Sequence, residues 1–355
     1  MYLGGVPSEP FAWISAIVAA TSLVAAARTR APWARGAYLV CFGISLALTV
    51  AEIGLGVYER MHAADPSATY DREYFIPDAA LGYAPKPGVR VASKLVVRDT
   101  VIYDVTYTID SNGERVTKGN PLGESWLFAG CSFTFGEGVN DDETLPSQFS
   151  AALGGRANVV NLGFHGYGAH QMLRILETDR AQRLVRSPVR QLVYLAIDDH
   201  PHRAAGRSSW DRLGPSYELT GTGVTYAGPF HSRIVSKLFG VAMRSHVFAL
   251  ALDLTAYRAT VSGDDIERWA RIVERSAVLT REKYGAGFTV LFWDDDNDVS
   301  RRALARLRAT KVPIVLVSEI IPRSEWPSML LPHDGHPKPE AYRRLAAGLA
   351  ERLNH

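Results

Sequence analysis

The first sixty residues contain two long apolar runs. Residues 11–27 (FAWISAIVAATSLVAAA) carry no charge, and residues 37–58 (AYLVCFGISLALTVAEIGLGVY) are interrupted only by Glu52. A membrane-spanning helix needs about 20 mostly apolar residues, so the second run is long enough and the first is at the lower limit. Two buried helices of a soluble core are the alternative, but neither run has a polar face. We therefore expect residues 1–60 to be a membrane anchor of two transmembrane helices.

The charges around these runs predict an orientation. Arg28, Arg30 and Arg35 lie in or beside the short segment between the runs, and no basic residue precedes the first run. The positive-inside bias then places this segment in the cytoplasm, and the rest of the chain on the periplasmic or extracellular side. A cleaved signal peptide would need a basic start. Glu52 is costly in lipid, so we expect it to face the other helix or to lie near an interface.

Short apolar runs alternate with helical patterns over residues 121–355. Before them, residues 61–120 are expected to form a polar linker (61–76) and a small antiparallel β unit, because VIYDVTYTI alternates and is followed by the turn DSNG. The predicted strands are WLFAG (126–130), NVVNLG (158–163), QLVYLAI (191–197), FTVLFW (288–293) and VPIVLVS (312–318). This alternation indicates an α/β fold whose parallel five-stranded sheet is flanked by helices. Residues 200–262 interrupt the alternation and are expected to be an insertion that includes a hairpin, with a lid as one possible role.

Residues with candidate chemistry follow the predicted strands. Gly130, Cys131 and Ser132 follow the first, NLGFHGYGAHQ (161–171) follows the second and AIDDHPHR (196–203) follows the third. Asp334 and His336 precede the last helix, in PHDGHPKPEA. Ligands of open parallel sheets bind beyond the carboxyl ends of the strands. A serine, glycine-rich backbone and an Asp/His pair are the parts that acyl transfer requires.

With these blocks in this order, residues 124–355 resemble an SGNH/GDSL hydrolase. The resemblance implies a flavodoxin-like sheet, with Ser132 as the nucleophile and His336 as the general base that Asp334 orients. It also implies that the N–H groups of Ser132 and Gly166 form the oxyanion hole, joined by a polar side chain at position 198. Neither a metal nor an organic cofactor is implied.

Three positions depart from the usual pattern of that family. Cys131 replaces the Asp of the GDS triplet, Asp198 replaces an Asn, and Asp334 and His336 are separated by one residue instead of two. An ionised carboxylate can only accept hydrogen bonds, so the part of Asp198 in the oxyanion hole is doubtful. Asp198 is either protonated and a donor, or ionised and turned toward Arg203 or His200; we favour the second. A Ser/His dyad is also left open.

Cys131 competes with Ser132 for the role of nucleophile. Adjacent residues of an extended segment point in opposite directions, so only one of the two faces the site. The resemblance places Ser132 outward and Cys131 inward, as a small buried residue. We favour Ser132.

The remaining polar motifs give weaker signals. DDHPH lacks the spacing of a zinc site, and WDDDND (293–298), which lacks the glycine and the last glutamate of an EF-hand, is expected to be a solvated loop. His165 and His170 are expected to line the site or lie at the surface. A net charge of +2 and only two cysteines exclude a strongly basic nucleic-acid-binding protein and a disulfide framework.

Together these patterns predict a membrane-anchored serine esterase that acts through an acyl-enzyme on Ser132. The expected substrate is an ester-bearing small molecule or polysaccharide, with acetyl esters of envelope carbohydrate favoured by the compartment and the resemblance. Two alternatives stay open. One is a polysaccharide O-acetyltransferase that uses the same site, and the other is a non-catalytic envelope carbohydrate-binding protein on a degenerate fold. The sequence does not indicate an oligomeric state.

Overall fold

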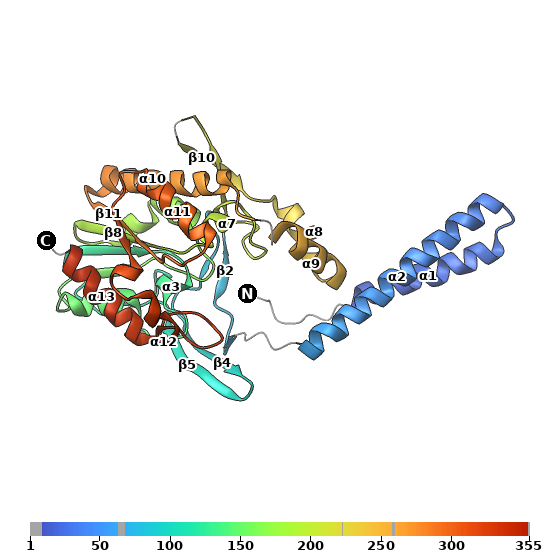
Figure 1. Ribbon diagram of the computed structural model, residues 1–355, viewed down its shortest axis with the longest axis horizontal. Helices are drawn as coiled ribbons and strands as arrows, with labels where there is room; N and C mark the ends of the chain where they lie inside the picture. The colour runs from blue at the N-terminus through green and yellow to red at the C-terminus, as the bar shows by residue number, and fades with distance from the viewer. Residues whose placement is uncertain (1–8, 63–67, 222, 258–259, 354–355) are drawn as a thin grey trace. The chain divides into compact units, whose positions relative to one another are not determined.

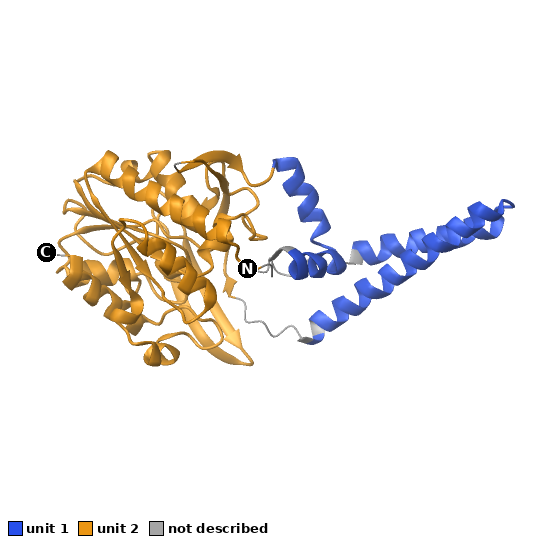
Figure 2. Ribbon diagram, turned by 45° about the horizontal axis from the view of Figure 1, so that its top comes forward, with its two compact units in different colours: residues 1–65, 232–259 blue, residues 66–231, 260–355 orange. Residues whose placement is uncertain are grey.

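The computed structural model describes residues 9–62, 68–221, 223–257 and 260–353 (Figure 1). The chain divides into two compact units (Figure 2). Unit 1 comprises residues 1–65 and 232–259, and unit 2 comprises residues 66–231 and 260–355. The expected insertion (200–262) is therefore divided between the units: residues 232–259 belong to unit 1, and the rest of it belongs to unit 2.

Unit 1 is helical and begins with the two apolar runs. The helices α1 (Glu9–Arg28) and α2 (Pro32–His62) pack along each other, and the hydroxyl of Thr49 donates to that of Ser15 at 2.8 Å. A proline occurs in the first turn of each helix, where its missing N–H costs nothing. Both helices are long and apolar enough to cross a membrane. Unit 1 also contains α8 (Arg233–Ala242), α9 (His246–Leu252) and a π-helical turn η1 (Asp253–Tyr257), which the sequence analysis did not predict.

Unit 2 is built on a parallel five-stranded sheet in the order β12-β11-β8-β6-β7. The strands are β6 (Ser125–Ala129), β7 (Asn158–Asn161), β8 (Val189–Ala196), β11 (Gly287–Phe292) and β12 (Ile314–Leu316). Numbered along the chain this is the order 2-1-3-4-5, the flavodoxin-like topology. The predicted fold class and all five predicted strands are confirmed.

Helices cover both faces of this sheet (Figure 1). Alternate strand residues feed two cores: Leu127 and Ala129 pack on one face, and Trp126 and Phe128 on the other. The first face is covered by α5 (Ala169–Glu177), α10 (Gly263–Tyr284) and α11 (Asp298–Arg308), and the second by α4 (Leu145–Ala152) and α13 (Pro339–Leu353). Shorter helical segments are α3 (Ser132–Phe135), α6 (Arg180–Leu184), α7 (His200–Ala204), η2 (Val317–Glu319), η3 (Arg323–Glu325) and α12 (Trp326–Met329).

Residues 69–108 form the expected antiparallel strands. These are β1 (Thr69–Tyr70), β2 (Phe75–Asp78), β3 (Gly82–Pro85), β4 (Arg90–Val97) and β5 (Thr100–Thr108). β1 and β2 begin inside the segment that was expected to be a polar linker. Tyr74, Leu95 and Tyr107 are buried in the same core as Leu127 of the central sheet. The β unit therefore packs as part of unit 2.

The expected hairpin of the insertion is also present. β9 (Pro215–Leu219) pairs antiparallel with β10 (Val224–Pro229), and Tyr217 is buried in the core of unit 2. The chain then leaves unit 2 after His231 and returns to it at Thr260.

Candidate active site

A sharp turn after β6 presents Ser132. Gly130 has φ +152°, and a Cβ there would lie 2.2 Å from Thr134 Oγ1 and 2.8 Å from the Leu195 carbonyl oxygen. Only glycine fits this approach of strand to helix. Cys131 is fully buried, whereas the hydroxyl of Ser132, the first residue of α3, reaches a histidine. Because Ser132 begins a helix, its N–H has no acceptor within that helix.

Ser132, His336 and Asp334 form a continuous hydrogen-bonded chain. Ser132 Oγ lies 2.7 Å from His336 Nε2, and Asp334 Oδ1 lies 2.6 Å from His336 Nδ1. The tautomer that fits has Nδ1–H donating to Asp334 and Nε2 accepting from the serine hydroxyl. Gly335, at φ +85°, allows the turn that brings the two side chains together across a single residue. The Asp-x-His spacing is thus long enough for an Asp–His contact.

A second carboxylate lies beside the same histidine. Glu137 Oε2 is 3.5 Å from His336 Nε2 and 2.6 Å from His165 Nδ1. The other ring nitrogen of His165, Nε2, lies 2.5 Å from the hydroxyl of Tyr74. In the neutral tautomer that satisfies both contacts, Tyr74 donates to Nε2 and Nδ1–H donates to Glu137. The sequence analysis did not select Glu137 or assign this contact to His165.

These contacts change the charge balance at the site. Burial raises the pKa of the Glu137 carboxyl, but His165 and His336 outweigh it and hold that pKa at about 2. Burial lowers the pKa of His336, but Glu137 and Asp334 outweigh it, so the pKa of His336 lies above its usual value. Glu137 is therefore ionised at neutral pH and favours a positive charge on His336.

The segment after β7 is fixed from three sides. Asn161 Nδ2 donates to the Thr134 carbonyl at 3.1 Å, and Asn161 Oδ1 accepts from the Gly163 N–H at 3.0 Å. The hydroxyl of Tyr83 donates to the His165 carbonyl at 2.6 Å. Gly166 has φ +71°, and a Cβ there would lie 2.8 Å from the Tyr83 hydroxyl oxygen. This position requires glycine, and the backbone before it is hydrogen-bonded by Tyr83 and Asn161.

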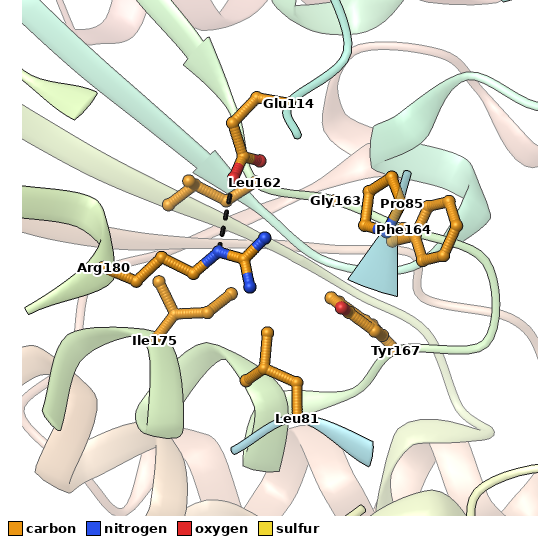
Figure 3. A pocket seen from close by; sticks show the side chains of 9 residues that line it. All are labelled: Leu81, Pro85, Glu114, Leu162, Gly163, Phe164, Tyr167, Ile175 and Arg180. Atoms are coloured by element: carbon orange, nitrogen blue, oxygen red, sulfur yellow. Dashed lines mark ion pairs between the residues drawn. The ribbon is translucent and has the colours of Figure 1, made fainter. Parts of the chain in front are cut away.

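The other face of this segment borders a small cavity of about 10 Å³ (Figure 3). Leu162, Phe164 and Tyr167 line it, together with Glu114 and Arg180, whose closest charged atoms are 3.5 Å apart. A space of this size holds at most one water molecule. It is a packing gap behind the segment.

Arg115 from the β unit supports the loop that follows Ser132, residues 135–141. Its side chain is fully buried, and it donates to the carbonyl oxygens of Phe135 at 2.8 Å, Gly136 at 2.5 Å and Val139 at 2.7 Å, and to Asp141 Oδ1 at 3.1 Å. The carbonyls accepting these bonds flank Glu137 on both sides. Sequence reasoning missed Arg115, which follows a turn and belongs to no motif.

Asp198 does not contact the partners that were expected for it. Its Oδ2 accepts from Asn297 Nδ2 at 2.6 Å, in the loop after β11. Arg203 instead pairs with Asp199 at 2.6 Å, and His200 Nδ1 lies 2.6 Å from the Tyr194 hydroxyl. The carboxylate is thus an acceptor turned toward Asn297.

Two further polar residues differ from expectation, whereas His165 lies beside the site, where it contacts Glu137. His170 is fully buried, and its Nε2 lies 2.7 Å from Asp211 Oδ2. Asp294, expected in a solvated loop, is buried and accepts from Ser318 and Arg323. Within the described part of the chain, no group of three or more His, Cys, Asp or Glu side chains could hold a metal ion.

The chain matches no protein-family model and no curated protein. Three solved structures illustrate its similarities. LAE5, an α/β hydrolase from the metagenome of Lake Arreo, is 12% identical; the match covers 66% of this chain and 96% of LAE5, with a TM-score of 0.41. A carbohydrate acetylesterase family member from Sinorhizobium meliloti is 15% identical, with 65% of this chain and 97% of that one covered and a TM-score of 0.34. AlinE4, an SGNH-hydrolase family esterase, is 13% identical, with 65% of this chain and 95% of that one covered and a TM-score of 0.33.

Proposed function

We propose that this chain is a membrane-anchored serine esterase of the SGNH type. The observation that carries the proposal is the hydrogen-bonded chain Ser132–His336–Asp334. Ser132 Oγ attacks the ester carbonyl while His336 Nε2 takes its proton, and His336 then returns the proton to the departing alcohol. Water, activated by His336, hydrolyses the acyl-enzyme. Asp334 holds the tautomer of His336 that this sequence of transfers requires.

The oxyanion of the tetrahedral intermediate is held by backbone donors. The N–H groups of Ser132 and Gly166 fill this role, as the family resemblance implies. Asp198 is assigned no part in the oxyanion hole, because its side chain accepts a hydrogen bond from Asn297. The complete Ser–His–Asp contact supports an enzyme over a non-catalytic binding protein.

The proposed substrates are acyl esters outside the cytoplasm, with acetyl esters of envelope carbohydrate as the favoured class. The support is the orientation that Arg28, Arg30 and Arg35, which lie between the two apolar runs of the sequence, predict. A reporter enzyme fused after residue 355 tests this orientation. It should be active outside the cytoplasm, and activity inside the cytoplasm would defeat the proposed topology.

Labelling with a fluorophosphonate tests the nucleophile. The full-length protein should be labelled covalently, Ser132→Ala should abolish labelling, and Cys131→Ala should retain it. Loss of labelling in Cys131→Ala alone would reverse the assignment. A panel of acyl esters, assayed with and without an added polysaccharide, then identifies the acyl group. Acetyl retained on the polysaccharide would indicate a transferase.

A further inference from the structure

The helices α8 and α9 of unit 1 expose large apolar side chains. The exposed fractions are 72% for Ile234, 65% for Leu238 and 52% for Val241. Neither helix has a buried residue among those described, although α9 is apolar around its whole circumference after His246. A helix that is apolar all round is normally surrounded by protein or by lipid. We call these two helices, residues 233–252, the α8–α9 pair.

The residues of α8 are divided between two faces. At 100° per residue, Ile234, Val235, Leu238 and Val241 share one side, and Arg233 and Lys237 share the other. Residues 232–252 contain three basic residues, the third being Arg244, and no acidic one. A short helix with an apolar face and a basic face is typical of a segment that lies in the surface of an anionic bilayer.

The pair is attached to α2 through Glu52. The carboxylate of Glu52 accepts from the hydroxyl of Ser245 and from the backbone N–H groups of His246 at 2.8 Å and Val247 at 3.3 Å. These N–H groups open α9 and have no acceptor within the helix. His246 Nδ1 also lies 2.8 Å from Glu59 Oε2. The one acidic residue within the apolar run of α2 thus caps the start of α9.

This attachment places the pair near one end of the apolar span of α2. The span ends at Glu59, seven residues after Glu52, which is about 10 Å along a helix. Interfacial helices bury their apolar faces to about 5–10 Å. The depth of the contact therefore agrees with a location at the membrane–water interface.

By length and composition the two helices together could also form a broken span or a re-entrant loop, but their geometry and connections favour a surface location. α8 has 10 residues, about 15 Å of helix, which is half of a bilayer core. The two helices are bent by 115° relative to each other. The chain also enters the pair from β10 and leaves it toward α10, which are both elements of unit 2. A segment whose two ends belong to one compact unit enters and leaves the bilayer on the same side.

We propose that the α8–α9 pair docks into the bilayer surface at the C-terminal end of α2, with its apolar face among the acyl chains and Arg233, Lys237 and Arg244 against anionic headgroups. This inference rests on the membrane anchoring proposed above. It does not depend on the esterase activity. Because the pair is an insertion in unit 2, it would attach that unit to the membrane through two further chain connections.

Site-specific quenching tests the docking. Single cysteines are introduced in a Cys41→Ser background, in which Cys131 is fully buried and a thiol-reactive probe should not reach it. An environment-sensitive fluorophore is attached at Leu238→Cys, on the apolar face, or at Lys237→Cys, its neighbour on the basic face. The full chain is placed in phosphatidylcholine vesicles, with and without phosphatidylglycerol, that contain lipid brominated on the acyl chains. The fluorophore at Val50→Cys, an exposed position of α2, reports on the anchor.

Quenching should be several-fold stronger at Leu238→Cys than at Lys237→Cys. Phosphatidylglycerol should increase it, and the triple change Arg233→Gln, Lys237→Gln, Arg244→Gln should remove that increase. Quenching at Val50→Cys but at neither α8 position would overturn the docking and leave the anchor standing. If the fluorophore at Leu238→Cys were shielded from the brominated lipid, and more so at higher protein concentration, the docking would also be overturned. Such a result would indicate that a second copy of the chain covers α8. Absence of quenching at Val50→Cys would refute the anchor as well.

Discussion

Replacing Glu137 by glutamine removes a negative charge that should affect both the pKa of His336 and the height of the activity plateau. Glu137 lies 3.5 Å from Nε2 of His336, the nitrogen that contacts the Ser132 hydroxyl, and it raises the pKa of His336. His336 must be neutral to act as a base, so activity rises with pH as His336 loses its proton. Removing the negative charge lowers the pKa of His336. The acid limb of kcat/KM should therefore move to lower pH in Glu137→Gln.

The size of the shift follows from the geometry. An opposite charge within 4–6 Å changes a pKa by about one to three units. Glu137 also bonds His165, so part of its charge is already compensated, and we expect about one unit. One unit corresponds to about 1.4 kcal/mol. The transition state contains a protonated His336 that loses the same stabilisation, so the plateau of kcat/KM should fall by up to about tenfold.

The assay is the pH dependence of kcat/KM on a small acetyl ester, compared with Asp142→Asn. Asp142 is an exposed carboxylate of the same loop that pairs with Lys118 instead of a site residue. In Asp142→Asn, the acid limb and the plateau of kcat/KM should both be the same as in the unchanged protein. If the acid limb of Glu137→Gln stayed in place or moved to higher pH, Glu137 would not act on His336 as a charge.

The other changes test the nucleophile, the support of its loop and the oxyanion hole. Ser132→Ala should lower ester turnover by several orders of magnitude while leaving thermal unfolding unchanged, and Asp334→Asn should have a milder effect. Arg115→Met should lower the free energy of unfolding by about 3–5 kcal/mol, measured by thermal or denaturant unfolding, because it leaves carbonyls and Asp141 without a buried donor; a change within about 0.5 kcal/mol would contradict this. Asp198→Asn should leave turnover unchanged, or raise it through a new donor worth at most about 2–4 kcal/mol. A high-pH loss of activity present in the original chain and absent from Asp198→Asn would instead indicate a protonated Asp198.

The central sheet could be predicted because its signal is local. Each predicted strand is a mostly apolar run of five to seven residues between polar segments, as is typical of a strand buried on both faces. The strand order followed from the family resemblance. The pair α8–α9 was missed although the spacing of Ile234, Leu238 and Val241 is helical, because the surrounding insertion had no regular alternation.

Only part of the site could be predicted from the sequence, for a different reason. Ser132, Asp334 and His336 belong to motifs, of which the first follows a strand and the second precedes the last helix. Glu137 and His165 are 28 residues apart and gain their role only when the turn after β6 and the segment after β7 come together. Asp198 could be identified as a departure from the usual family pattern. Its hydrogen-bond partner Asn297 follows a different strand, and no spacing in the sequence indicates that the two residues meet.

The position of Arg115 argues that the β unit and the central sheet act as one structure. A buried guanidinium needs several acceptors in a fixed plane, and here three are carbonyls of the loop that carries Glu137. Those carbonyls, in turn, have a charged donor only while the β unit is folded against the sheet. Tyr74 of the same unit bonds His165, which bonds Glu137. The charge next to His336 is thus positioned by residues that precede the first strand of the sheet, so the boundary near residue 120 divides the sequence pattern but not the site.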